Sequence, residues 1–165
     1  MTEHTTSFSW GHINVNVTDL DQSIAFYQKL GFELLILGIP YLGLNQDLRA
    51  PAVNMTEALD LEADVTGRAC IMQLGQGYPK LDLTQWQSAD ASRPLNSSDV
   101  GIVRLCLGTS NLAEDYAHLL DQGVTFITAP QSAHRGMADI ATCLDPDGAQ
   151  IELIQVHYDK WPKNK

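Results

Sequence analysis

The chain has 165 residues, of which 44% are hydrophobic and 18% are charged. This is the balance of a globular protein long enough to bury a core. Twenty Asp and Glu against ten Lys and Arg give a formal net charge of −10, which argues against nucleic acid and anionic membranes as partners because both would repel it. No apolar run approaches the roughly 20 residues that span a bilayer, and Met1 to Trp10 lacks the basic start and apolar centre of a signal peptide. We therefore expect a cytoplasmic protein with a single domain over residues 1–165.

An internal repeat organises the sequence. Residues 12–32 align without a gap with residues 104–124, an offset of 92 (104 minus 12). Residues 80–85 align with residues 150–155, an offset of 70 (150 minus 80). The chain is therefore predicted to contain two copies of one β-α-β-β-β unit, and the first copy carries 22 extra residues (92 minus 70) before its last strand.

The alternation of apolar residues and the turn signals predict the elements of each copy in the order strand, helix and three strands. The first copy has them over residues 10–17, 20–30, 32–37, 68–74 and 81–86. The second has them over residues 100–109, 111–122, 124–127, 138–144 and 150–155. The predicted organisation is module one at 10–86 with an insertion at 38–67, a linker at 87–99, and module two at 100–157.

The first predicted strand has an unusual polar face. Ile13, Val15 and Val17 alternate with His12, Asn14 and Asn16, so the two sets point to opposite sides of a sheet. Polar residues on one side indicate a cavity or an interface.

The insertion at 38–67 has two interpretations that the sequence leaves open. A short helix with an apolar side of Met55, Ala58, Leu59 and Leu61 would suit a lid over an apolar substrate. The same surface would also suit a cap on the sheet edge or a contact between two copies of the chain. We expect a homodimer.

The repeat also aligns four polar residues that open or interrupt apolar strands: His12, Asp82, Arg104 and Glu152. His12 falls on Arg104, and Asp82 falls on Glu152. If the two copies pair about a pseudo-twofold axis, these side chains surround one cleft.

The last strand follows a tight turn at Asp145-Pro146-Asp147-Gly148. Together with Gly11-His12, Asp19-Leu20-Asp21, Phe26-Tyr27 and Leu30-Gly31-Phe32, the run from Asp145 to Leu153 resembles the vicinal oxygen chelate superfamily, also called glyoxalase/bleomycin resistance/dioxygenase proteins. The resemblance implies an α+β fold in which two paired β-α-β-β-β modules form a curved mixed β-sheet with a central cavity and helices outside. It extends from His12 to Gln155.

The resemblance also implies a divalent metal in the cavity. His12, Asp82 and Glu152 match ligand positions and suit Fe²⁺, Mn²⁺, Ni²⁺ or Zn²⁺. Arg104 stands where such proteins often have His, and a guanidinium has no lone pair for a metal. Arg104 could instead pair with the carboxylates, bind an anionic substrate group, or stabilise an enolate oxygen. The forms with and without metal both stay open, as does a vestigial site in which Arg104 only neutralises the carboxylates.

The leading functional hypothesis is a glyoxalase-like isomerase, epimerase or lyase. It would transfer a proton next to a carbonyl of a small oxygenated organic substrate, with His12, Glu152 and Arg104 as catalytic residues. The alternative is a non-catalytic binding or sequestering protein similar to bleomycin-resistance proteins. A ring-cleaving dioxygenase is disfavoured because its triad uses two His and one carboxylate.

Three further residues are candidate substrate contacts: Trp86, Tyr78 and His134. Core packing is the competing explanation for the two aromatic residues, and a solvated loop is the competing explanation for His134. Gly75 and Gly77 precede a strand and not a helix, so no nucleotide cofactor is predicted. The three cysteines, Cys70, Cys106 and Cys143, lie in predicted strands and are expected to be buried and inert.

Overall fold

The computed structural model describes residues 6–87 and 93–162. Part of the predicted linker at 87–99 therefore lies outside the described residues. The chain divides into two compact units, one containing Met1–Ile24 with Gly31–Asp90 and the other Ala25–Leu30 with Ala91–Lys165. We describe each unit separately.

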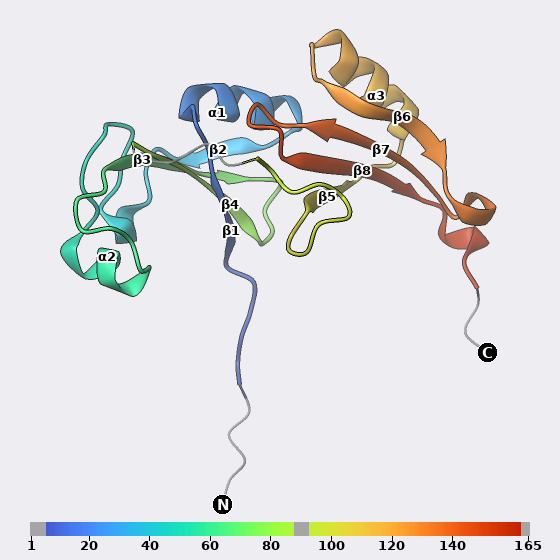
Figure 1. Ribbon diagram of the computed structural model, residues 1–165. Coiled ribbons are helices and arrows are strands. Elements are labelled where there is room, and N and C mark those ends of the chain that lie inside the picture. The colour runs from blue at the N-terminus through green and yellow to red at the C-terminus, as the bar shows by residue number, and fades with distance from the viewer. Residues whose placement is uncertain (1–5, 88–92, 163–165) are drawn as a thin grey trace, which may run out of the picture. The chain divides into compact units, whose positions relative to one another are not determined.

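The first unit carries a four-stranded mixed sheet in the order β1-β4-β3-β2. Strand β1 runs parallel to β4, and the other neighbours are antiparallel. The elements up to the end of this module, which apart from η1 are labelled in Figure 1, are β1 (His12–Asn16), α1 (Leu20–Lys29), β2 (Glu33–Ile36), η1 (Pro40–Leu42), α2 (Val53–Ala58), β3 (Gly67–Gln73) and β4 (Lys80–Trp86). The β-α-β-β-β order predicted for the first module is confirmed.

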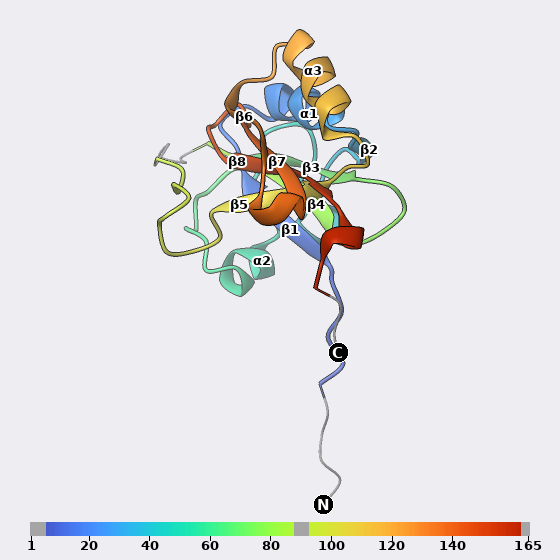
Figure 2. The same cartoon turned by 90° about the vertical axis from the view of Figure 1, so that its right-hand side faces the viewer.

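The second unit repeats the arrangement in the order β5-β8-β7-β6, with β5 parallel to β8. Helix α3 contacts β6, β7 and β8 and lies along one face of their sheet in both views (Figures 1 and 2). The elements are β5 (Arg104–Gly108), α3 (Leu112–Asp121), β6 (Phe126–Ser132), η2 (His134–Gly136), β7 (Ala138–Leu144), β8 (Gln150–Val156) and η3 (Tyr158–Lys160). The α+β fold built from two such modules is thereby confirmed. None of the described helices has the length and apolar character needed to cross a membrane.

The strand registers follow the two sequence offsets. His12 pairs with Lys80 in the first sheet, and Arg104 pairs with Gln150 in the second. The same holds for a pair of glutamines: Gln85 Oε1 accepts from the Leu20 backbone N–H at 2.9 Å, and Gln155 Oε1 accepts from Leu112 N–H at 2.9 Å. Each glutamine therefore satisfies an N–H that would be orphaned at the start of the module's helix.

The outer parallel strands β1 and β5 both alternate between exposed and half-buried residues. His12 is on the exposed side of β1, and Arg104 and Cys106 are on the exposed side of β5. The opposite face of each sheet contributes apolar residues such as Leu81 and Ile151, which are almost fully buried. The predicted two-faced strand is confirmed, and it leaves polar side chains on an open face.

The insertion at 38–67 packs onto its own module. Ile39, Leu42 and Leu44 form a buried cluster with Ala69 of β3. Met55, Ile71 and Trp86 pack against this cluster. The segment that carries η1 is therefore anchored by apolar side chains at 0–5% exposure, and not held only by its ends.

The Asp145 turn is stabilised by its own carboxylate. Asp145 Oδ1 accepts from the N–H groups of Asp147 at 3.0 Å and Ala149 at 2.7 Å, and Oδ2 accepts from the Tyr27 hydroxyl at 3.2 Å. Burial raises the pKa of Asp145, and the hydrogen bonds from Ala149 and Asp147 oppose that shift. Gly148 has φ of +87°, which glycine adopts without steric cost.

Candidate active site

The candidate residues fall into two groups, one in each unit, which we call the first half and the second half and describe separately. The first half lies on β1 and β4. Because β1 and β4 are parallel and in register at Asn14 and Asp82, His12 and Asp82 have side chains on the same sheet face. His12 Nδ1 lies 3.7 Å from Asp82 Oδ2, a distance too long for a direct hydrogen bond. The His12 side chain is 45% exposed and that of Asp82 only 2%. A half-exposed imidazole thus stands beside a buried carboxylate.

Asp82 receives a hydrogen bond from the insertion. The hydroxyl of Tyr41 in η1 donates to Asp82 Oδ2 at 2.9 Å, and the rings of Tyr41 and His12 lie 6.2 Å apart. Within the described part of the chain, Asp82 Oδ1 is buried without a hydrogen-bond partner. Burial raises the pKa of Asp82 above its ordinary value, although the Tyr41 hydrogen bond and His12 act against this shift. Burial and the bond to Asp82 raise the pKa of Tyr41 to about 12.

The second half lies on β5 and β8. Arg104 Nε donates to Glu152 Oε2 at 2.5 Å, with 38% of the Arg104 side chain and 14% of the Glu152 side chain exposed. The guanidinium has further N–H donors on its Nη atoms. Since such donors bind carboxylates and phosphates in a planar fork, this half is suited to an anionic group.

Cys106 differs from the prediction. Cys70 and Cys143 are buried as expected, but Cys106 is exposed. It stands opposite Glu152 in the strand register, and its Sγ donates to Glu152 Oε1 at 3.4 Å. The expectation of a buried thiol was wrong for Cys106 because it lies on the same open face of β5 as Arg104. Although the residue is exposed, partial desolvation of the thiol, followed by the bond to Glu152, raises the pKa of Cys106 to about 11.

The structure thus brings together His12 with Asp82 in one unit, and Arg104 with Glu152 in the other. Over residues 6–87 and 93–162, no three His, Cys, Asp or Glu side chains are grouped closely enough to hold a metal ion. The donors of the first half nevertheless fit a divalent cation, because imidazole nitrogen and carboxylate oxygen are suitable ligands and Asp82 Oδ1 is an orphaned buried acceptor. Arg104 does not fit, since it has no lone pair.

The three predicted substrate contacts lie in different surroundings. Trp86 packs against the buried cluster of the insertion, and a Cβ on Gly67 would lie 2.5 Å from its ring, so only glycine leaves room for it. Tyr78 is 67% exposed, with Lys80 Nζ 4.9 Å from its ring centroid. His134 is exposed in η2. Their roles in substrate binding stay predictions.

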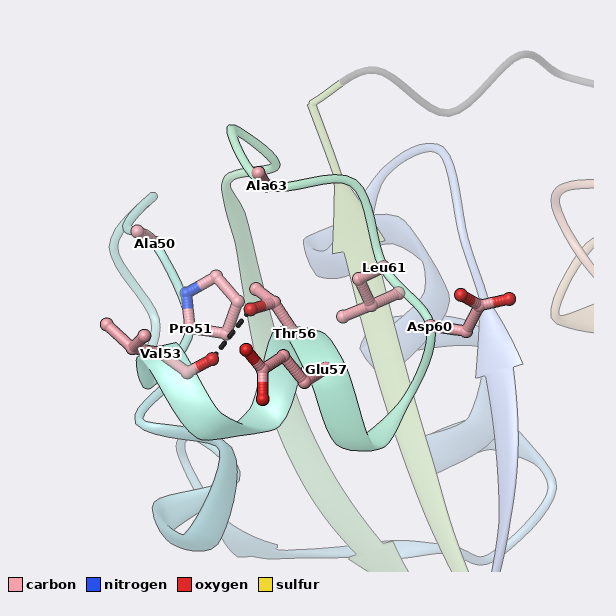
Figure 3. A pocket seen from close by; sticks show the side chains of 8 residues that line it. All are labelled: Ala50, Pro51, Val53, Thr56, Glu57, Asp60, Leu61 and Ala63. Carbon is pink, nitrogen blue, oxygen red and sulfur yellow. Dashed lines mark hydrogen bonds between the residues drawn. The ribbon is translucent and has the colours of Figure 1, made fainter.

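A surface pocket of about 480 Å³ lies within the insertion (Figure 3). Its lining includes none of the predicted site residues and consists of Ala50, Pro51, Val53, Thr56, Glu57, Asp60, Leu61 and Ala63. In Figure 3 the carboxylate of Asp60 points away from that of Glu57. The two acids therefore do not converge on one point, and this pocket does not replace the sheet face as the candidate site.

Two residues beside the predicted site residues were missed from the sequence. Cys106 had a usable signal, because it lies two residues after Arg104 in an alternating strand and so shares its face. Tyr41 had none, since it belongs to the insertion and has no counterpart in the second copy of the repeat.

The sequence was compared with known proteins. The model of the Glyoxalase/Bleomycin resistance protein/Dioxygenase superfamily matches residues 9–153. A search of curated proteins finds no match.

Solved structures show the same fold at low sequence identity. A glyoxalase family protein from Bacillus cereus is 14% identical with a TM-score of 0.72, covering 94% of this chain and 98% of that one. A glyoxalase family protein from Enterococcus faecalis is 21% identical with a TM-score of 0.60, covering 87% and 94%. The trypanothione-dependent glyoxalase I of Leishmania major is 21% identical with a TM-score of 0.56, covering 90% and 87%.

Proposed function

Since this chain belongs to the Glyoxalase/Bleomycin resistance protein/Dioxygenase superfamily, we propose that it is an isomerase, epimerase or lyase that transfers a proton next to a carbonyl group of a small oxygenated organic molecule. The superfamily includes isomerases, lyases, dioxygenases and resistance proteins, so membership alone does not select among these. The observation that carries the proposal is the half-exposed His12 imidazole beside the buried Asp82 carboxylate.

His12 acts as the general base. Its neutral imidazole accepts the proton from the carbon next to the carbonyl, and the electron pair of that C–H bond moves onto the carbonyl oxygen as an enolate. The Asp82 carboxylate lies 3.7 Å from Nδ1, so it acts through its charge and not through a direct hydrogen bond. That charge favours the tautomer with hydrogen on Nδ1 and stabilises the imidazolium that forms. Returning the proton to a carbon gives an isomer or epimer, whereas loss of a leaving group from the neighbouring carbon gives a lyase product.

The negative charge on the enolate oxygen must be stabilised by a nearby positive charge. Arg104 is oriented by Glu152 through Nε and offers its Nη donors to a carboxylate or an enolate oxygen. The form with metal is an alternative to His12 acting as the base: His12, Asp82 and Glu152 would then hold a divalent ion, which when bound supplies Lewis-acid polarisation of the carbonyl. Elemental mass spectrometry of protein purified without chelator separates the two forms. Near-stoichiometric metal in wild type that is lost in Glu152→Ala supports the form with metal. Absence of metal from both proteins supports the form in which Arg104 stabilises the enolate.

The competing function is a protein that holds a ligand without changing it, for which the net charge of −10 favours a cationic ligand. His12→Ala and Glu152→Ala distinguish the two. An enzyme loses turnover in both variants while its circular dichroism and melting temperature are kept. A sequestering protein shows no turnover to lose and keeps most of its ligand affinity in both variants.

A homodimer remains part of the proposal. The insertion at 38–67 offers exposed apolar residues for it, Leu48, Val53 and Leu59. A continuous run along and just after β2 adds Leu34, Leu35, Ile36 and Leu37. Sedimentation velocity at micromolar concentration is expected to show a dimer, and a monomer at all concentrations would contradict it.

A further inference from the structure

We propose that Tyr41 is a positioning residue of the candidate active site, and that the insertion at 38–67 serves to supply it. Through its hydroxyl, Tyr41 fixes the Asp82 carboxylate so that Oδ2 faces His12 Nδ1 and Oδ1 is left as the acceptor for a bound ligand. This inference rests on the proposed function, in which His12 and Asp82 act together.

The backbone of Tyr41 is held firmly, whereas its side chain extends from the turn. Its neighbours Ile39 and Leu42 are buried at 0% and 5% exposure, and Gly43 N–H closes the 3-10 turn on Pro40 O at 3.0 Å. The Tyr41 side chain is itself 54% exposed. An exposed aromatic residue on an anchored turn is not needed for packing, so its hydrogen bond to Asp82 is the contact that distinguishes it.

The hydrogen bond from Tyr41 selects which oxygen of the Asp82 carboxylate stays unpaired. Tyr41 donates to Oδ2, which is also the oxygen 3.7 Å from His12 Nδ1. Oδ1 is buried and, in the described part of the chain, has no partner. An unpaired buried acceptor is costly unless a ligand, ion or water completes it. The arrangement suits a carboxylate that is held on one side and used on the other.

The matching carboxylates of the two modules, Asp82 and Glu152, are held by different partners. The second module has no counterpart of the insertion, and Glu152, which matches Asp82, is held instead by Arg104 and Cys106 from the neighbouring strand β5. In the first module the neighbouring strand offers His12, which at 3.7 Å does not hydrogen-bond to Asp82. Tyr41 thus replaces an orienting partner that β1 does not supply. Removing a residue that hydrogen-bonds to a metal ligand typically lowers metal affinity by about 10- to 100-fold.

The test uses the intact chain with Tyr41→Phe, which removes the hydroxyl and keeps the ring. Tyr116→Phe is the matched control, because Tyr116 lies on α3 and packs edge-on against Phe126. The first readout is the ¹⁵N chemical shifts of the histidine rings in chelator-treated protein at one fixed pH, which report the tautomer of His12. The second readout is the affinity for Ni²⁺ by titration calorimetry.

We expect wild-type His12 to carry its hydrogen on Nδ1, and Tyr41→Phe to shift its ring nitrogens toward a mixture of tautomers. His118 and His157 serve as internal references and should not change. Tyr116→Phe should match the wild type throughout. If His12 has the same shifts in Tyr41→Phe and wild type, or carries its hydrogen on Nε2 in both, the positioning role is overturned.

The Ni²⁺ titration separates this inference from the proposed function. Affinity reduced about 10- to 100-fold in Tyr41→Phe supports positioning of a ligating carboxylate. If wild type binds no Ni²⁺ but His12 still responds to Tyr41→Phe, the metal form of the proposed function fails and the positioning role stands. If wild type binds Ni²⁺ and Tyr41→Phe binds it equally well with unchanged His12 shifts, the positioning role fails and the metal form stands.

Discussion

Replacing Asp82 by Asn should make the protein more stable at neutral pH. Asp82 is 1% exposed and Oδ1 lacks a partner among the described residues. Leaving such a group unpaired costs about 1–3 kcal/mol. The amide of Asn has nearly the same shape as the carboxylate, and its oxygen can accept the hydrogen bond from the Tyr41 hydroxyl. Its NH₂ group, however, stays unpaired. We therefore expect recovery of only part of the cost, an increase in the free energy of unfolding of about 1 kcal/mol.

The gain should depend on pH with a defined sign. The pKa of Asp82 in the folded protein is raised above its ordinary value of 3.8, so the folded state binds this proton more tightly than the unfolded state. Its contribution to stability is fully present below the unfolded pKa and is lost as pH rises through the folded pKa. Wild type should therefore become less stable than Asp82→Asn as pH rises. The free energies of unfolding of the two proteins should converge near and below the pKa of Asp82 in the unfolded state.

Urea unfolding of chelator-treated wild type, Asp82→Asn and the exposed control Asp64→Asn, at about pH 7 and about pH 4, measures this difference. The control, an exposed residue outside the candidate site, should change the free energy of unfolding by no more than about 0.5 kcal/mol. A variant Asp82→Asn that is less stable than wild type at pH 7, or a difference of equal size at both pH values, would refute the reasoning.

Three other outcomes are expected. Gln85→Ala and Gln155→Ala should each lower the free energy of unfolding by about 1 kcal/mol, because each removes the acceptor for one helix-start N–H. Gln85 also accepts from Arg68 Nε at 2.9 Å, so its loss should cost at least as much as that of Gln155; urea unfolding that gives a cost for only one of them would contradict this. Cys106 should be the thiol that reacts first with an aromatic disulfide reagent, and Glu152→Gln should speed the reaction at mildly alkaline pH because it removes one cause of the raised pKa; peptide mapping that finds another cysteine would contradict this. Arg104→Ala should lower stability by about 1 kcal/mol in the same unfolding assay, less than for a fully buried pair because Arg104 is 38% exposed.

The repeat made much of the fold predictable. Offsets of 92 and 70 residues in sequence become the same strand register in both sheets, as the pairs His12 with Lys80 and Arg104 with Gln150 show. They do so because a parallel pair of strands with one buried face has a strongly specified register. The same alignment singled out Arg104 and Glu152, but it left carboxylate pairing as one of several roles for Arg104; that they lie on neighbouring strands comes from the structure.

The sequence was less informative about contacts that cross from the insertion. Tyr41 is a single aromatic residue in a Gly- and Pro-rich segment, and its approach to Asp82 depends on how Ile39, Leu42 and Leu44 pack. Packing of an irregular segment leaves no periodic pattern in the sequence from which this contact could be predicted. The exposure of Cys106 was missed for a different reason, because a cysteine between leucines favours a buried interpretation while its shared face with Arg104 was decisive.

The central claim is proton transfer from carbon by His12, and solvent deuterium measures it most directly. A panel of small carbonyl compounds is incubated in D₂O with wild type and with His12→Ala, and deuterium gain next to the carbonyl is followed by ¹H NMR. We expect catalysed exchange for at least one compound in wild type and its loss in a folded His12→Ala variant. Binding of a compound, seen as line broadening, with no exchange above background in either protein would contradict catalysis and favour a sequestering protein.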